Sequence, residues 1–146
     1  MARYSVGTRS TGAGSTTLAV GSLFAAANND FYLVECGAFN TTTTACAIAL
    51  RRWTALGTQG TGLSEIPWDP DTTAATATAY DTHTVTGTIT AGYFATASLG
   101  AAIGSGVIWT FGVHGIRVPK GTGNGLAIMV ATGTGQILDW YMIWDE

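Results

Sequence analysis

The sequence predicts an all-β protein, a single β-sandwich of jelly-roll type with a short N-terminal arm and one short helical turn. Its 146 residues include 25 threonines and 20 glycines, and only 10% of them are charged. Threonine is β-branched and favours strands, whereas glycine favours the turns that connect them. Short β-rich runs between closely spaced turn signals are typical of sandwiches. A chain of this length can bury a core as one domain.

Strands are predicted wherever alternation or a β-rich run lies between turn residues. One hairpin is predicted from residues 31–39 and 45–53, and a second from residues 126–131 and 136–144. Alternating threonines predict two strands, or one long bent strand, within residues 75–90. Shorter strands are predicted at residues 16–20, 94–99, 107–111 and 116–119. The core face of the first hairpin is expected to carry Tyr32, Val34, Cys36, Ala38, Cys46, Ile48 and Leu50.

The N-terminal segment is interpreted as a flexible arm over residues 1–14, followed by the sandwich domain over residues 15–146. The arm mixes glycine, serine and threonine with Arg3 and Arg9, and such segments stay mobile unless a partner holds them. The apolar run that follows could also be read as a signal peptide, but Gly21 and Ser22 interrupt it. A helical turn over residues 23–27, capped by Ser22, is the preferred interpretation.

The last predicted strand, residues 136–144, is apolar on both faces. Leu138, Trp140, Met142 and Trp144 are expected to face the core, with the reverse assignment left open. The opposite face carries Ile137, Asp139, Tyr141 and Ile143. An apolar outer face needs a second covering, and we expect a neighbouring subunit to supply it. Asp139 interrupts that face, so its carboxylate is expected to meet an arginine or backbone N–H groups, within the chain or across a subunit boundary. Arg117 and Arg52 are the candidate arginines.

The two cysteines, Cys36 and Cys46, match no metal-binding or redox motif. In the predicted hairpin they would be diagonal neighbours about 7–8 Å apart at the backbone, too far for an unstrained disulfide. We expect buried free thiols.

Catalytic and phosphate-binding motifs do not occur in the sequence. Asp81 and His83 would share one face of a strand and could bind a metal together with His114 or Asp139. Solvated polar residues near a strand end explain the same pattern. We therefore expect no metal and no cofactor.

Other functional classes have little support in the composition. A hydrolase would have to use the cluster of Asp69, Asp71, Asp81 and His83, and Asx turns explain these acids at least as well. The only adjacent basic pair is Arg51–Arg52, which does not favour nucleic-acid binding. The sequence contains no run of about 18 apolar residues, so no membrane-spanning helix is predicted. The expectation is a protein that is not an enzyme and that binds neither nucleic acid nor a membrane.

Several segments of the chain have a recognisable pattern, namely residues 57–63 (GTQGTGL), 68–71 (WDPD), 81–85 (DTHTV), 99–111 (LGAAIGSGVIWTF), 133–136 (GTGQ) and 144–146 (WDE). In these segments the chain resembles small virion proteins of tailed bacteriophages, and most closely capsid decoration, or cement, proteins. Proteins of that class are often β-rich trimers at the three-fold positions of a phage head. The resemblance implies a structural virion protein, made in the host cytoplasm, located on the capsid surface and bound to the major capsid protein.

The leading hypothesis is therefore a homotrimeric decoration protein that stabilises a phage capsid. Arg3 and Arg9 on the arm, and Trp68 in the long loop of residues 55–73, are the candidate capsid contacts. The alternative is a carbohydrate- or receptor-binding knob of a phage tail or head fibre, with Trp53, Trp68, Tyr80 and Tyr93 as candidate stacking platforms.

Overall fold

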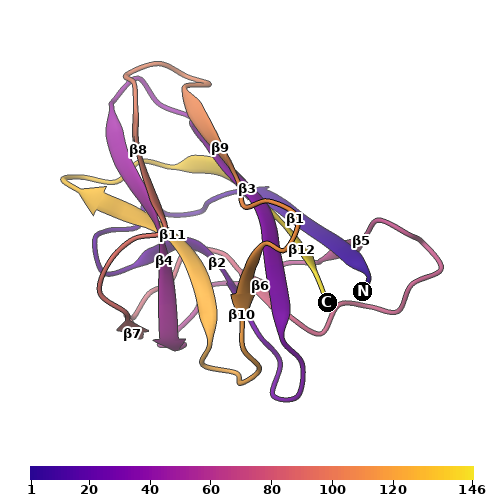
Figure 1. The fold of residues 1–146 in the computed structure, drawn as a ribbon. Helices are drawn as coiled ribbons and strands as arrows, with labels where there is room; N and C mark the ends of the chain where they lie inside the picture. The colour runs from indigo at the N-terminus through magenta and orange to yellow at the C-terminus, as the bar shows by residue number, and fades with distance from the viewer.

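The computed structural model describes all of residues 1–146 and contains two antiparallel sheets of six strands each, with no helix. The sheets face each other as two layers, and the N- and C-termini lie close together at one end (Figure 1). This arrangement confirms the predicted all-β sandwich. The jelly-roll subtype remains a prediction. Because the chain forms no helix, none is long and apolar enough to cross a membrane.

The first sheet, sheet A, is built around the closing strand of the chain. Its order is β10-β3-β12-β1-β5, and β9 also pairs with β3. The strands are β1 (Arg3–Arg9), β3 (Phe31–Asn40), β5 (Ile66–Pro67), β9 (Gly106–Thr110), β10 (Ile116–Val118) and β12 (Leu138–Asp145).

The second sheet, sheet B, has the order β6-β2-β11-β4-β7, and β8 also pairs with β4. Its strands are β2 (Ala19–Phe24), β4 (Cys46–Ala55), β6 (Thr78–Tyr80), β7 (Thr88–Ile89), β8 (Ala95–Leu99) and β11 (Gly125–Thr132). The threonine-rich stretch thus forms only the short strands β6 and β7. The outermost strands of both sheets are two to five residues long, and such short edges limit edge-to-edge pairing.

No two consecutive strands of the chain pair with each other. Both predicted hairpins are therefore wrong, because β3 and β4 lie in different sheets, as do β11 and β12. The chain arches from one sheet to the other at Asn40, which is buried. Its side-chain amide donates to the carbonyls of Thr44 (2.6 Å) and Gly100 (3.1 Å), and its side-chain oxygen accepts from the Thr42 N–H (3.0 Å). These bonds stabilise an arch in place of a hairpin turn.

The predicted flexible arm is wrong, because half of it, Arg3–Arg9, is strand β1. Residues Arg3 to Arg9 pair with Asp145 to Asp139 over the whole length of the strand. Tyr4 and Val6 are buried in the core, so β1 has the alternation of a half-buried strand. The partner strand lies at the other end of the sequence.

The predicted helical turn at residues 23–27 is also wrong, since Leu23 and Phe24 are the last residues of β2 and residues 25–27 form no helix. Strand β2 is bonded to β11 on one side and to β6 on the other. Its pairing with β11 shifts register between Ile128 and Met129. Hydrogen bonds to both neighbouring strands therefore outweigh the local preference of Ser22 for capping a helix.

Part of the predicted core face is wrong in strand β3, because Tyr32 and Val34 do not face the core. The register between β3 and β12 shifts between Ile143 and Trp144, which are opposite Glu35 and Leu33. Because of this bulge, the residues buried in the core are Phe31 and Leu33 before it and Cys36 and Ala38 after it. Tyr32 and Val34 are only half-buried. A bulge reverses which residues face the core, so a strict alternation assumed along the whole strand is wrong on one side of the bulge.

The main core lies between the sheets. The inward face of β12 supplies Leu138, Trp140, Met142 and Trp144, as predicted, and all four are buried. Opposite them, Gly21 of β2 lies so close to the ring of Trp140 that a Cβ there would overlap it. Cys36 and Cys46 are buried and free, which confirms that prediction, and burial raises the pKa of Cys36 to about 12.

Sheet B has a second, smaller core on its outer face. It consists of Ala19, Phe24, Trp53, Ala127 and Met129, packed against the half-buried Leu56, Tyr80 and Ile89. The indole N–H of Trp53 lies 3.1 Å from the sulfur of Met129. Leu56 and His83, both from the chain between β4 and β7, therefore cover part of the outer face of sheet B, whereas the outward residues of β12 in sheet A are partly exposed.

Candidate functional site: the outer face of sheet A

The outer face of sheet A carries all four residues predicted for a subunit interface. Ile137, Asp139, Tyr141 and Ile143 alternate with the buried residues of β12 and point away from sheet B. All four are partly exposed; Ile137 is 36% exposed. The prediction that β12 has an inward and an outward face is confirmed. Their role as an interface stays a prediction.

Neighbouring strands extend this face, because residues directly opposite each other in a sheet share one side. Asp139 is opposite Phe39 of β3, and Ile143 is opposite Glu35. Ile108 of β9 is opposite Gly37 on the same side and is 54% exposed. Neither Phe39 nor Ile108 is among the residues predicted from the sequence for this face. Ile108 could have been predicted from alternation, because it lies between Val107 and Trp109, which face the core, and must therefore point outward.

Tyr141 occupies the centre of the face. It lies between Gly37 of β3 and Gly7 of β1, and its ring covers Gly37 so closely that a Cβ there would overlap it. The Tyr141 hydroxyl donates a 2.6 Å hydrogen bond to the Glu35 carboxylate. Burial and this carboxylate raise the pKa of Tyr141 well above its usual range. The ring is therefore held flat against the sheet.

Two ion pairs neutralise the β1 side of the face. The guanidinium of Arg9 donates two hydrogen bonds to Asp139 (2.7 and 2.9 Å), and that of Arg3 donates two to Asp145 (2.7 and 2.8 Å). The hydrogen bond from Arg9 lowers the pKa of Asp139. Both predicted partners of Asp139 are wrong, because Arg117 pairs with Asp30 (2.8 Å) and Arg52 donates to a backbone carbonyl. The two arginines predicted to contact a capsid thus bind carboxylates of their own chain.

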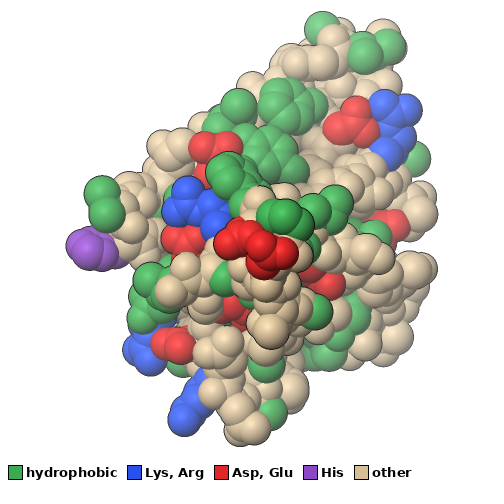
Figure 2. Space-filling view, turned by 90° about the vertical axis from the view of Figure 1, so that its right-hand side faces the viewer, with side chains coloured by type: hydrophobic (Ala, Val, Ile, Leu, Met, Phe, Trp, Pro, Cys, Tyr) green, Lys and Arg blue, Asp and Glu red, His purple; other side chains and the backbone are tan.

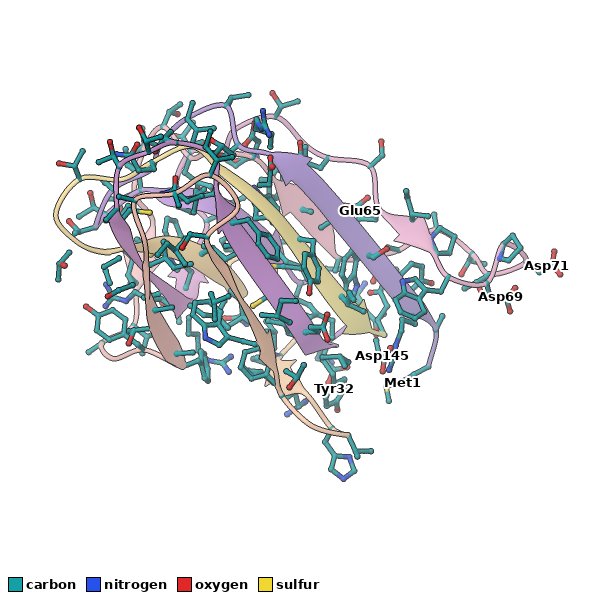
Figure 3. The ribbon with its side chains drawn as sticks, turned by 90° about the horizontal axis from the view of Figure 1, so that it is seen from above. Met1, Tyr32, Glu65, Asp69, Asp71 and Asp145 are labelled. Atoms are coloured by element: carbon teal, nitrogen blue, oxygen red, sulfur yellow. The ribbon has the colours of Figure 1, made fainter.

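Trp68, the third candidate capsid contact, lies at the rim of this face just after β5. Its side chain is 56% exposed, and the guanidinium carbon of Arg3 lies 5.5 Å from the centre of its ring. The turn that follows is closed by the Asp71 N–H donating to the Asp69 carboxylate (3.0 Å). Asp69 and Asp71 lie at the end of a loop that projects beyond the strands (Figure 3).

The surface seen from this side is mixed, with an apolar centre. Figure 2 shows hydrophobic side chains gathered near the middle, with acidic and basic side chains beside them. By strand pairing and alternation, the apolar residues on the outer face of sheet A are Phe39, Ile108, Ile137, Tyr141 and Ile143. The face thus resembles a contact surface more than a site for chemistry, since its charged groups are already paired.

A hydroxyl paired with an imidazole lies elsewhere, on the outer side of sheet B. The Ser22 hydroxyl and His83 Nε2 are 2.7 Å apart. Both residues are buried, at 0% and 2% exposure, and His83 Nδ1 has no hydrogen-bond partner. A substrate cannot reach this pair, and no carboxylate orients the imidazole as a catalytic triad requires. The pair is part of the packing of the small core.

The residues considered for a metal or hydrolase site do not come together. No group of three His, Cys, Asp or Glu side chains is placed to hold a metal ion. Asp81 instead accepts hydrogen bonds from the N–H groups of Thr82 (2.7 Å) and Thr11 (3.2 Å). His114 lies in the turn between β9 and β10, and Asp139 is bound to Arg9.

The four candidate stacking platforms for a sugar are also dispersed. Trp53 is fully buried and Tyr80 is half-buried, so neither offers a free ring face. Trp68 and Tyr93 are exposed (56% and 52%), and an arginine lies over each ring. Tyr93 borders an open pocket of about 180 Å³ beside β4.

Comparison of the chain with protein-family models, with curated proteins and with solved structures gave no match.

Proposed function

We propose that this chain is a structural virion protein, a homotrimer that binds the outer surface of a phage capsid and stabilises it. The observation that supports this most directly is the outer face of sheet A. Its centre is apolar, and its arginines are paired with carboxylates of the same chain. Such a face can be buried against another copy without bringing unpaired like charges together.

The second copy of the chain is the occupant that fits this face best. Charged groups make up 10% of the chain, and those on the face pair internally, so the surface offers no strong field to attract a charged partner. Apolar surface of this kind is the usual core of a homo-oligomer interface. Large exposed apolar patches are uncommon on monomeric proteins.

A closed trimer also needs a second patch, because a cyclic contact other than a two-fold axis joins two different surfaces. The edge beside β1 supplies one. Strand β5 is a two-residue edge strand, and its Ile66 is 63% exposed. This edge adjoins the outer face of sheet A. Contact between one copy's edge and the next copy's face would close into a trimer if each copy is rotated by a third of a turn relative to the last.

Binding to the capsid is assigned to the rim beyond that edge. Trp68 is exposed, and the adjacent Asp69–Asp71 turn projects from the sandwich. Arg3 contacts Trp68 and Arg9 lies on the same strand, but both guanidinium groups are occupied by carboxylates. We therefore expect Trp68 to contribute more to shell binding than either arginine. Binding only to the assembled shell would stabilise it by mass action.

The first experiment measures the mass of the purified protein in solution by light scattering. The wild type is expected at three times the 15.0 kDa chain mass, and Ile108→Asp is expected to be a folded monomer. Val113→Asp is the matched control, because Val113 is 92% exposed in a turn outside the face. Ile108 is a cleaner position than Tyr141, where a new carboxylate would also meet Glu35. A monomeric wild type would contradict the trimer, and a trimeric Ile108→Asp variant would contradict the assignment of the outer face of sheet A as its interface.

The second experiment tests the capsid. Undecorated phage heads are mixed with wild-type protein or with Trp68→Ala, and the temperature of shell rupture is measured. Wild-type protein is expected to raise it, whereas Trp68→Ala is expected to remain trimeric but to bind weakly. An unchanged rupture temperature with saturating wild-type protein would refute the decoration function.

A further inference from the structure

The pocket beside β4 lies away from the outer face of sheet A and has a different chemistry. It is lined by Arg52 and by the loop that leads into β8, namely Thr90, Ala91, Gly92, Tyr93 and Phe94. Two arginines, two aromatic rings and a short glycine-containing loop meet there. The proposed shell-binding function makes no use of this group.

The loop is held in place from both ends. The Thr90 N–H donates to the Arg52 carbonyl and the Phe94 N–H donates to the Leu50 carbonyl, both at 2.9 Å. The Arg51 side chain then spans the loop, donating to the carbonyls of Thr90 (3.0 Å) and Gly92 (3.3 Å). A loop bonded at several points loses little further entropy when a ligand binds, which makes the site preorganised.

The aromatic side chains of the loop remain accessible. Tyr93 is 52% exposed and Phe94 is 43% exposed. The guanidinium of Arg51 lies 4.9 Å from the ring centre of Tyr93, and that of Arg52 lies 5.2 Å from the ring centre of Phe94. Each arginine therefore fixes the orientation of one ring by a cation–π contact.

Arg52 has unused hydrogen-bonding capacity in this pocket. It makes one side-chain hydrogen bond, to the Arg117 carbonyl at 3.0 Å, although a guanidinium has five N–H donors. Neither Arg51 nor Arg52 lies within ion-pair distance of a carboxylate, in contrast to Arg3, Arg9 and Arg117. Partial burial also lowers the pKa of Arg52. An anion placed at Arg52 would supply the missing counter-charge.

We infer that this pocket binds a single sugar ring carrying a carboxylate. The carboxylate would accept hydrogen bonds from the Arg52 guanidinium, whose planar geometry suits a two-oxygen acceptor. The apolar C–H face of the sugar ring would lie against Phe94 and Tyr93. A pocket of about 180 Å³ is smaller than the roughly 300–1,000 Å³ of sites for drug-sized ligands, which limits the ligand to about one ring. The inference does not depend on shell binding.

The test is a nuclear magnetic resonance titration of the full-length protein with methyl glucuronide, methyl glucoside and acetate. The glucuronide is expected to shift the signals of Arg52, Tyr93 and Phe94 and to bind roughly ten-fold or more tightly than the neutral glucoside. Acetate alone is expected to bind more weakly than the glucuronide, because it lacks the ring. Equal binding of glucuronide and glucoside, equal binding of glucuronide and acetate, or no binding would each overturn the inference.

Variants separate the two halves of the site. Arg52→Gln is expected to abolish the preference for the glucuronide, whereas Phe94→Ala is expected to weaken both sugars. Lys120→Gln is the matched control, since Lys120 is an exposed cation that does not line the pocket. Retained preference in Arg52→Gln would overturn the assignment of the carboxylate. If Arg52→Gln does not fold, the wild-type comparison of ligands and the Phe94→Ala variant still decide the matter.

Discussion

Acidification from neutral pH toward about pH 4 is expected to destabilise this protein through His83. His83 is 2% exposed and lies among the rings of Phe24, Trp53 and Tyr80, with its Nε2 2.7 Å from the Ser22 hydroxyl. Burial lowers its pKa from 6.5 to about 4. The backbone of Leu56 opposes this shift, but the effect of burial is larger. Nδ1 of His83 has no hydrogen-bond partner.

The sign and size of the effect follow from the two pKa values. The folded chain keeps His83 neutral down to about pH 4, whereas the unfolded chain takes up a proton below about pH 6.5. The stabilisation is complete above the unfolded value and is lost as the pH falls toward the folded one, at up to about 1.4 kcal/mol per pH unit. Between about pH 7.5 and about pH 5 the free energy of unfolding should fall by about 2 kcal/mol.

The assay is urea unfolding of wild type and His83→Gln at those two pH values and at one protein concentration. Glutamine cannot titrate, so its packing defect affects both measurements and cancels in their difference. Asp30 and Asp139 have pKa values lowered below 3.8 by their arginines, so their contributions are lost only at lower pH. We expect wild type to lose about 2 kcal/mol and the variant much less. Equal losses in both proteins would refute the assignment to His83.

Three further predictions concern packing and pairing. Gly21→Ala should lower the free energy of unfolding by about 1–3 kcal/mol, because the new methyl group would overlap the Trp140 ring. Gly62→Ala is the control and should not lower it, because its methyl group would meet only a ring atom of Tyr80, 4.0 Å away. A double-mutant cycle of Arg3→Gln and Asp145→Asn should give a coupling below about 1 kcal/mol that weakens with salt; a coupling above about 2 kcal/mol would contradict this. Both buried cysteine thiols should react with a thiol reagent only at the rate of unfolding, and prompt reaction of the folded protein would count against this.

Much of the fold was predictable because alternation is a local property of the chain. The strands predicted at residues 94–99, 107–111 and 116–119 correspond to β8, β9 and β10. The inward and outward faces of β12 also follow from a period of two alone. The composition predicted an all-β protein, because threonine favours strands and glycine favours turns. The number of short strands between closely spaced turns then predicted a sandwich.

The incorrect predictions concern features that depend on contacts with residues far away in the sequence. Asn40 closes an arch between sheets, although the residues around it have the composition of a hairpin loop. The bulge in β3 reverses the faces of Tyr32 and Val34, and nothing in the local pattern marks it. The N-terminal arm is a strand because β12 binds it. Pairing energy between strands, rather than local propensity, decides these features.

The candidate site divides in the same way. The sequence by itself determined that Ile137, Asp139, Tyr141 and Ile143 share one face, since strand geometry requires it. Only the tertiary structure decided that Arg9 neutralises Asp139, because the two residues are 130 positions apart. Hydrogen bonds between β1 and β12 set that register and thereby place both arginines of the supposed arm on the outer face of sheet A. Local geometry thus determines which side chains point outward, while non-local pairing determines what they meet.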